Sequence, residues 1–229
     1  LSGWKLRSIR GDIWDSSLLL TKIIKHSIKS KEEMVYEIGS NSDLVYENMI
    51  TNNLKWTIEE FGKINKGYLT FPTKFHQIDD IIGIKHNKRT IIRVSVNPEE
   101  IINNIELKTS SLDKRIEAIN KLCDDNYKVG ILIAPVIMVN NYKKLYKELI
   151  ITLKNKLSEK VKKEVFFEVI FMTYSYVNNV INKEAFPNLI NLYDKNIQTG
   201  RGKGKYVYKP SLKEEGKTYI EELLNVYFP

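Results

Sequence analysis

Cysteine is nearly absent from this sequence, which has one, Cys123, in 229 residues. One thiol cannot form a disulfide within the chain, and this fits a reducing compartment. A cysteine-ligated iron–sulfur cluster needs several thiolates, so the residues of this chain alone cannot hold one. Cys123 falls on the apolar side of a predicted helix, and we expect it in the core rather than as a nucleophile.

The sequence also lacks a long hydrophobic run and a secretory leader. No apolar stretch approaches the roughly 20 residues that a membrane-spanning helix requires. The opening segment, LSGWKLRSIRGD, does not have the charged-then-apolar layout of a signal peptide. These features predict a cytoplasmic protein with no membrane partner. The first residue is Leu1 rather than Met, which suggests that a segment precedes it.

Metal and nucleotide motifs are missing as well. The three histidines show no HxH or HExxH spacing, so no metal site is expected in this chain. His76 follows a predicted strand and is a candidate base or ligand, whereas His86 is expected on an exposed turn. No glycine-rich fingerprint joins a strand to a helix. GRGKGK (200–205) precedes a strand, and we interpret it as the tip of a β-hairpin.

What the sequence does have is the composition of a globular domain with a basic surface. Apolar residues make up 42% and charged residues 28%, and 36 basic against 28 acidic residues give a charge of +8. Such a charge favours polyanions such as DNA, although a lysine-rich solvated surface would produce it too. A C-terminal stretch is the better candidate for a phosphate-facing patch: Lys195, Arg201, Lys203, Lys205, Lys209, Lys213 and Lys217.

Strand-like and helical patterns alternate along the chain. Strands are expected at 34–38, 68–73, 91–97, 129–136 and 165–172. Helices are expected at 16–31, 47–62, 110–125 and 142–157, with a short helical turn near 78–84. The alternation predicts an α/β fold with a parallel sheet, either barrel-like or doubly wound. A hairpin and a terminal helix are expected after residue 188.

Small hydroxyl residues, a lysine and exposed backbone occur at the ends of the predicted strands, where β/α barrels place their reactive groups. Lys74 would bind a carboxylate or phosphate, or form a Schiff base if it were buried. The same residue types also commonly cap strands and begin helices, so this pattern alone leaves both interpretations open. The strand ends in question are 39–43, 73–76, Ser95 with Asn97, 134–135 and 172–174.

Longer strings are more specific than residue types. TKFHQIDDIIGIKHNKRT, SVNPEEIINNIELKTSSLDKRIEAINKL and NYKVGILIAPVIMVNNYKKLYKELI, followed by FEVIFMTY and GRGKGKYVYK, resemble consecutive segments of spore photoproduct lyases. The resemblance covers 34–229. It implies a partial β/α (TIM-like) barrel of the radical S-adenosylmethionine type with a C-terminal β-hairpin and helix. It also implies a [4Fe–4S] cluster on a CxxxCxxC loop, and a 5′-deoxyadenosyl radical that abstracts hydrogen from a thymine dimer lesion.

Carried over position by position, the resemblance implies specific roles. Ser42 and Asp43 match the family segment that lies against the adenosine of S-adenosylmethionine. Lys74 matches the lysine of the family's TKFH motif, which together with the serine matching Ser95 holds the methionine carboxylate. Ala134 matches the alanine of IAP, whose backbone meets adenine. The hairpin matches the family's lesion-binding hairpin, and its candidate DNA contacts form one cluster: Arg201, Lys203, Lys205 and Tyr206.

The chain also departs from the family pattern. CxxxCxxC is absent, so the [4Fe–4S] cluster is expected only with an N-terminal cysteine loop that this sequence lacks. Ser40 stands where repair-competent members have the cysteine that returns a hydrogen atom to the product radical. A serine O–H bond is too strong for that transfer. Phe171 and Met172 replace the Gln-His pair of many members, and residues 1–15 do not resemble the family.

Two hypotheses follow. The first is a radical S-adenosylmethionine lyase that repairs UV-induced thymine dimer lesions in DNA, with a reducing electron donor as a further partner. The alternative is a non-catalytic or divergent member that binds nucleic acid through its basic hairpin. The long matching strings disfavour an unrelated Schiff-base barrel. We expect an N-terminally incomplete barrel over 1–187 and a DNA-contacting hairpin and helix over 188–229. The sequence indicates no oligomeric state.

Overall fold

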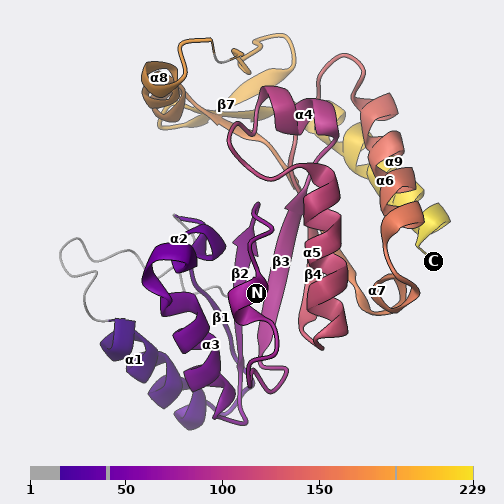
Figure 1. Cartoon of the computed structure of the whole chain (residues 1–229). Helices are drawn as coiled ribbons and strands as arrows, with labels where there is room; N and C mark the ends of the chain where they lie inside the picture. The colour runs from indigo at the N-terminus through magenta and orange to yellow at the C-terminus, as the bar shows by residue number, and fades with distance from the viewer. Residues whose placement is uncertain (1–15, 40–41, 189, 229) are drawn as a thin grey trace. The chain divides into compact units, whose positions relative to one another are not determined.

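The computed structural model describes residues 16–39, 42–188 and 190–228 (Figure 1). Its larger sheet has five strands. Their order in the sheet, β1-β2-β3-β4-β5, is also their order in the chain. A doubly wound sheet would reverse its order at a switch point, so the consecutive order selects the barrel-like alternative. The strands are β1 (Val35–Glu37), β2 (Tyr68–Thr73), β3 (Thr90–Val96), β4 (Lys128–Val136) and β5 (Phe166–Phe171).

All five predicted strands are present within one or two residues of their expected bounds. The β1–β2 and β2–β3 pairings are parallel, as predicted. Helices accompany the strands: α1 (Ser16–Lys29), α2 (Leu44–Thr51), α3 (Asn53–Gly62), a 3-10 turn (Asp79–Ile81), α4 (Glu99–Asn104), α5 (Leu112–Asp124), α6 (Tyr142–Lys156) and α7 (Glu159–Glu164). The short helices α4 and α7 were not predicted.

The single helix predicted over 47–62 is wrong, because the chain breaks it into α2 and α3 at Asn52. Asn52 has a φ of 53°, a left-handed conformation that asparagine tolerates better than most residues. The side chain of Asn48 then takes over a helix-capping role, since its Oδ1 accepts from the Lys55 N–H at 3.1 Å. That bond satisfies one of the amide groups that the start of α3 leaves without a helical partner.

The chain divides into two compact units, each built from separated segments. The first comprises the described residues up to Ser95 together with 114–131 and 158–166. The second comprises 96–113, 132–157 and the described residues from 167 onward. The division expected near residue 188 stays a prediction.

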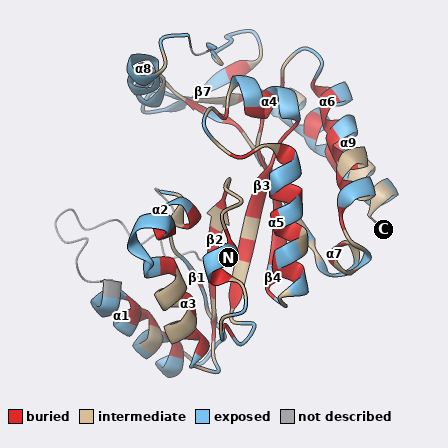
Figure 2. Cartoon of the chain, viewed as in Figure 1, coloured by how far each residue is buried: buried red, intermediate tan, exposed pale blue. Residues whose placement is uncertain are grey.

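In the first unit, α1 and α3 cover one face of β1 and β2 (Figure 1). A buried cluster forms from Leu20 and Ile23 of α1, Phe61 of α3, and Tyr36 and Leu69 of the strands. Each such side chain contributes about 1.5 to 3 kcal/mol through burial of its apolar surface. Figure 2 shows the same inward faces as buried. Cys123 of α5 is buried as well, as predicted.

The prediction that His86 lies on an exposed turn is wrong, because its side chain is buried. Its ring stacks on Tyr127 with centroids 3.8 Å apart. Its Nδ1 accepts from the Lys88 N–H, and its Nε2 lies 3.0 Å from the Asp125 carbonyl oxygen. Both ring nitrogens therefore interact with backbone groups, and His86 fixes a loop instead of facing solvent.

The second unit holds a three-stranded antiparallel sheet in the order β6-β8-β7. Its strands are β6 (Thr173–Ser175), β7 (Gln198–Gly202) and β8 (Lys205–Tyr208), and the helices α8 (Tyr176–Ala185) and α9 (Pro210–Tyr227) flank β7 and β8 in the chain. The hairpin β7–β8 turns through Gly202, Lys203 and Gly204, all with positive φ. The predicted hairpin and terminal helix are thus confirmed, whereas α8 was not predicted.

Within the described part of the chain, none of the helices combines the length and the hydrophobicity needed to cross a bilayer.

Candidate functional site

The two faces of the sheet differ in polarity within the first unit. Tyr36, Leu69, Phe71, Ile92 and Val94 share one face and are buried. The opposite face carries Glu37, Thr70 and Arg93 among apolar residues, and there an ion pair joins Arg93 Nη2 to Glu37 Oε2 at 3.0 Å. Parallel sheets in α/β proteins are usually apolar on both faces. The polar face is therefore a candidate ligand-binding surface.

A buried hydroxyl on this polar face supports that interpretation. The β1–β2 register sets Thr70 opposite Glu37. Thr70 Oγ1 is buried and has no hydrogen-bond partner among the residues that the structure describes. A buried polar atom of this kind is costly unless something else pairs with it.

Asp43 joins the end of β2 to the start of α2. Its Oδ1 accepts from the Val45 and Tyr46 N–H groups, at 3.1 and 3.4 Å, and so caps the helix. The same oxygen accepts from Thr73 Oγ1 at 2.8 Å, and Oδ2 accepts from the Lys74 N–H at 2.8 Å. The Asp43 carboxylate, which was predicted to lie against adenosine, thus accepts four hydrogen bonds. Its structural role is to fix the backbone at Lys74.

Lys74 and Ser95 lie at matching positions of neighbouring strands. The β2–β3 register pairs Thr73 with Val94, so Lys74 and Ser95 come one step further along in the same direction. Neighbouring strands are about 4.8 Å apart, close enough for two side chains to share one ligand group. Ser95 is buried, and its carbonyl oxygen accepts from Arg115 Nη1 at 2.9 Å. A cation and a hydroxyl held side by side suit a carboxylate.

Three further residues were predicted near these strand ends: Ser42, Ser40 and His76. Ser42 is exposed directly before Asp43. Ser40, which stands at the hydrogen-donor position, lies outside the described residues. His76 follows Lys74, and burial, with a contribution from the charge of Lys114, lowers the pKa of its imidazole. His76 is therefore neutral at pH 7. Among the described residues, no cluster of three histidine, cysteine or acidic side chains is arranged to hold a metal ion.

Ala134 belongs to the second unit, where β4 ends and side chains hold the turn that follows. The Ile137 N–H donates to Tyr146 Oη at 2.8 Å, and the Met138 N–H donates to Tyr208 Oη at 2.9 Å. Asn97 Nδ2 donates to the Pro135 carbonyl oxygen at 3.2 Å. Burial raises the pKa of Tyr208 to about 12, so its phenol stays protonated.

A buried network supports these bonds from behind. Tyr146 Oη donates to Asn97 Oδ1 at 3.1 Å, and Asn97 Nδ2 donates to Glu106 Oε1 at 2.7 Å. Networks in which buried polar groups are paired make a local conformation specific. These bonds fix the conformation of the backbone that follows Ala134.

The hairpin residues predicted to bind DNA divide into two kinds. Arg201, Lys203 and Lys205 are exposed, as a phosphate-contacting cluster requires. Tyr206 is half-buried in a group of tyrosine rings, with centroids 4.7 Å from Tyr193 and 6.1 Å from Tyr174. Tyr206 therefore also anchors the hairpin to the rest of its sheet.

Sequence reasoning missed the residues that organise these strand ends: Arg115, Tyr146 and Tyr208. Arg115 lies between Leu112 and Ile119 on the apolar side of α5 and is fully buried. A charged residue inside an apolar stripe was therefore the available signal. No comparable signal marked Tyr146 and Tyr208, because a tyrosine in a core position is common and its hydroxyl partner is remote in the chain.

Comparison with known proteins identifies what this arrangement is similar to. A family model described as spore photoproduct lyase matches residues 20–229. The spore photoproduct lyase of Bacillus subtilis (strain 168) is 31% identical over 198 residues, which are 85% of this chain and 58% of that protein. The spore photoproduct lyase of Clostridium acetobutylicum is 34% identical over 217 residues, 92% of this chain and 63% of that protein. The chain thus spans about three fifths of the length of these curated relatives.

Solved structures give the same result. A mutant spore photoproduct lyase with bound AdoMet and dinucleoside spore photoproduct superimposes with a TM-score of 0.87 at 26% identity. The match covers 94% of this chain and 65% of that one. Another spore photoproduct lyase, complexed with dinucleoside spore photoproduct, also gives 0.87. The predicted partial β/α barrel with its C-terminal hairpin and helix is confirmed, and so is the predicted resemblance.

We expect Asp43→Ala to destabilise the first unit by about 2 to 3 kcal/mol. The substitution removes a helix cap and leaves the Lys74 N–H and the Thr73 hydroxyl without their acceptor. Urea unfolding followed by circular dichroism measures the change. Asp113→Ala is the matched control, because Asp113 makes an exposed ion pair with Lys156. Equal losses in the two variants would contradict the linking role of Asp43.

We expect Tyr208→Phe to cost about 1 to 3 kcal/mol, because the ring remains while the buried Met138 N–H loses its acceptor. Hydrogen exchange should then accelerate at the amide of Met138. Tyr219→Phe is the control, since the Tyr219 hydroxyl donates to the Lys143 carbonyl oxygen at an exposed position. Unchanged stability and exchange in Tyr208→Phe would show that this bond does not hold the turn.

Proposed function

Because the chain belongs to the spore photoproduct lyase family, we propose that it functions as a radical S-adenosylmethionine lyase that repairs UV-induced thymine dimer lesions in DNA. The proposal assigns it two surfaces. The polar face and strand ends of the barrel take S-adenosylmethionine, and the basic hairpin takes DNA in the cytoplasm.

The register between β2 and β3 carries the cofactor half of this proposal. It sets Lys74 beside Ser95, and the two match the family residues that hold the methionine carboxylate. Asp43 fixes the backbone of Lys74, and Arg115 fixes that of Ser95. The backbone positions from which the ammonium and hydroxyl groups extend are therefore fixed before a carboxylate binds, which reduces the entropic cost of binding.

The residues present fit S-adenosylmethionine in chemistry. Lys74 supplies the cation for its carboxylate, and Ser95 a hydroxyl donor. Ala134 is small enough for adenine to approach the backbone, and Asn97, Tyr146 and Tyr208 keep the following turn in place. When bound, the cofactor supplies radical chemistry through its 5′-deoxyadenosyl group. The chain's own residues bind and orient it.

The residues of this chain do not fit a [4Fe–4S] cluster. Cys123 is its one cysteine, and that side chain is buried in α5. Burial, with the nearby charge of Glu164, raises the pKa of its thiol, which disfavours the thiolate that iron would need. A reducing electron donor is a partner only where cluster cysteines are supplied from outside this sequence.

The exposed basic hairpin carries the DNA half of the proposal. Arg201, Lys203 and Lys205 cluster on β7, β8 and their turn, and relatives of this chain are solved with dinucleoside spore photoproduct. The same observation, combined with the single buried cysteine, also favours the second candidate function. In that case the protein is a non-catalytic member of the family that binds nucleic acid through the hairpin.

We expect Lys74→Ala to weaken S-adenosylmethionine binding about 10- to 100-fold, because a charge-assisted hydrogen bond to the carboxylate is lost. Isothermal titration of the chain with S-adenosylmethionine measures the change. Lys63→Ala removes an equal charge from an exposed ion pair with Glu60 and should leave the affinity unchanged. If neither the variants nor the unmodified chain bound S-adenosylmethionine, the proposed cofactor site would be contradicted. The non-catalytic function would then remain.

We expect replacement of Arg201, Lys203 and Lys205 by alanine to lower DNA affinity and to flatten its dependence on salt. Each lost phosphate contact reduces the slope of log K against log salt by about 0.9. Fluorescence anisotropy with a labelled duplex at several salt concentrations measures this slope. Lys74→Ala should leave it unchanged, since Lys74 is assigned to the other site. An unaltered slope in the triple variant would refute the hairpin assignment.

A further inference from the structure

Helix α8 in the second unit presents an apolar stripe to solvent. Tyr176, Val177, Val180 and Ile181 recur at helical spacing along one side, with exposed fractions of 61, 59, 43 and 57%. No residue of α8 is buried. Figure 2 shows nearly the whole helix in the colour of exposed residues. Contiguous exposed apolar surface of this kind is uncommon unless something binds there.

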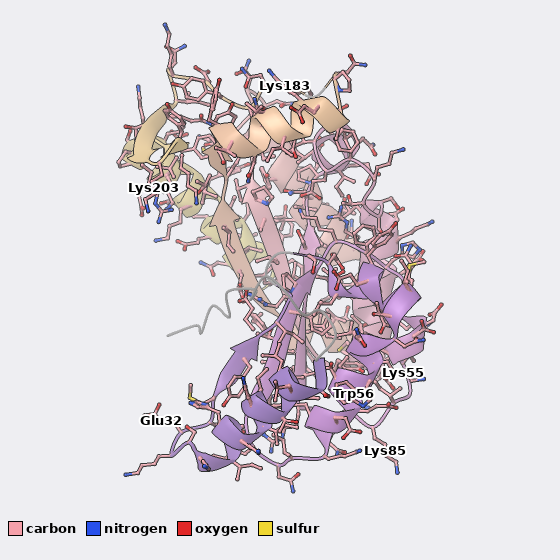
Figure 3. All side chains as sticks on the ribbon, turned by 90° about the vertical axis from the view of Figure 1, so that its left-hand side faces the viewer. Glu32, Lys55, Trp56, Lys85, Lys183 and Lys203 are labelled. Atoms are coloured by element: carbon pink, nitrogen blue, oxygen red, sulfur yellow. The ribbon has the colours of Figure 1, made fainter. Side chains whose placement is uncertain are left out.

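The stripe begins where the basic hairpin turns. The Tyr176 N–H donates to the Gly204 carbonyl oxygen at 2.9 Å, which joins the first turn of α8 to the hairpin turn. The β6–β8 register pairs Ser175, the N-cap of α8, with Lys205. Figure 3 labels Lys183 on α8 and Lys203 at the hairpin turn. The start of the apolar stripe therefore lies beside the turn that carries the exposed cations.

The charged residues around the stripe indicate what kind of molecule binds there. Residues 173–209 include six basic side chains against two acidic ones, Glu184 and Asp194. Such a field favours a polyanion and disfavours a second copy of this equally basic surface. A polyanion that also offers apolar area is nucleic acid with exposed base faces. Intact duplex DNA shows mainly phosphates and base edges, whereas a distorted step exposes the faces of its bases.

We propose that the stripe of α8 contacts unstacked bases at a distorted site in DNA while Arg201, Lys203 and Lys205 hold the flanking phosphates. This inference rests on the proposed function, in that it takes damaged DNA as the partner. It adds a second element, α8, to the hairpin and assigns it a different task. The hairpin provides affinity for any DNA, and the stripe discriminates distorted from intact DNA.

The double variant Val177→Gln with Ile181→Gln tests this, since glutamine preserves helix propensity and removes the apolar contact. The probes are a labelled duplex with two adjacent T·T mismatches and the fully matched duplex of the same length. We expect affinity for the mismatched duplex to fall about tenfold and affinity for the matched duplex to fall less than about twofold. The salt slope should not change, because apolar contacts release no counterions.

The matched control is Ile28→Gln with Val226→Gln, which makes the same kind of change at exposed positions of α1 and α9. It should alter neither affinity. Thermal unfolding of the α8 variant should match that of the unmodified chain, because exposed side chains contribute little to stability. A marked fall in melting temperature would show that protein covers the stripe, and this would overturn the proposal.

Other outcomes distinguish the role proposed for α8 from the proposed function on which it rests. Unchanged discrimination in the α8 variant, together with weaker binding by Lys203→Ala, would overturn the role of α8 and leave DNA binding through the hairpin intact. Self-association of the unmodified chain that the α8 substitutions abolish, without an effect on DNA, would assign the stripe to a second copy. Failure of the unmodified chain to bind either duplex would overturn both proposals.

Discussion

Where a strand leaves a sheet, its next backbone N–H groups lose their ladder partners, and the structure of this protein depends on how side chains replace them. After β2 the carboxylate of Asp43 accepts from the Lys74 N–H. After β4 the hydroxyls of Tyr146 and Tyr208 accept from the Ile137 and Met138 N–H groups. Because a buried unpaired N–H costs about 1 to 3 kcal/mol, these acceptors fix the backbone at the places where parallel-sheet proteins bind ligands.

This constraint explains why residues that touch no ligand matter to the site. Tyr208 is the last residue of β8, so the strand that carries the hairpin also holds the turn after β4. Gly216 of α9 packs beside the Met138 side chain, and a Cβ there would lie 2.8 Å from Met138 Cε. Arg115 acts similarly on β3 through the Ser95 carbonyl. The proposed ligand contacts are few, and most of the supporting chemistry is positional.

Periodicity in the sequence predicted the strands, since β-rich runs such as VGILIAPV depend on local hydrophobicity alone. It could not predict the break between α2 and α3, where Asn52 is left-handed and the Asn48 side chain accepts from the Lys55 N–H, because neither feature alters the apolar periodicity. His86 was misplaced for a similar reason, as its burial depends on Tyr127, 41 positions along. The candidate site was found through strand ends and resemblance. Its supporting residues were not, since each is defined by a partner remote in the chain.

The distribution of polarity finally limits which chemistry these residues can perform. The single thiol lies in a core beside Glu164, where burial keeps it protonated, and His76 is neutral at pH 7. The inner face of the barrel instead supplies cations and hydroxyls, and the hairpin supplies exposed cations. Such an inventory suits the binding and orientation of anionic ligands, and under the proposed function the bond cleavage is driven by S-adenosylmethionine. Many side chains fix the strand ends, which is consistent with a protein whose own residues bind and position ligands.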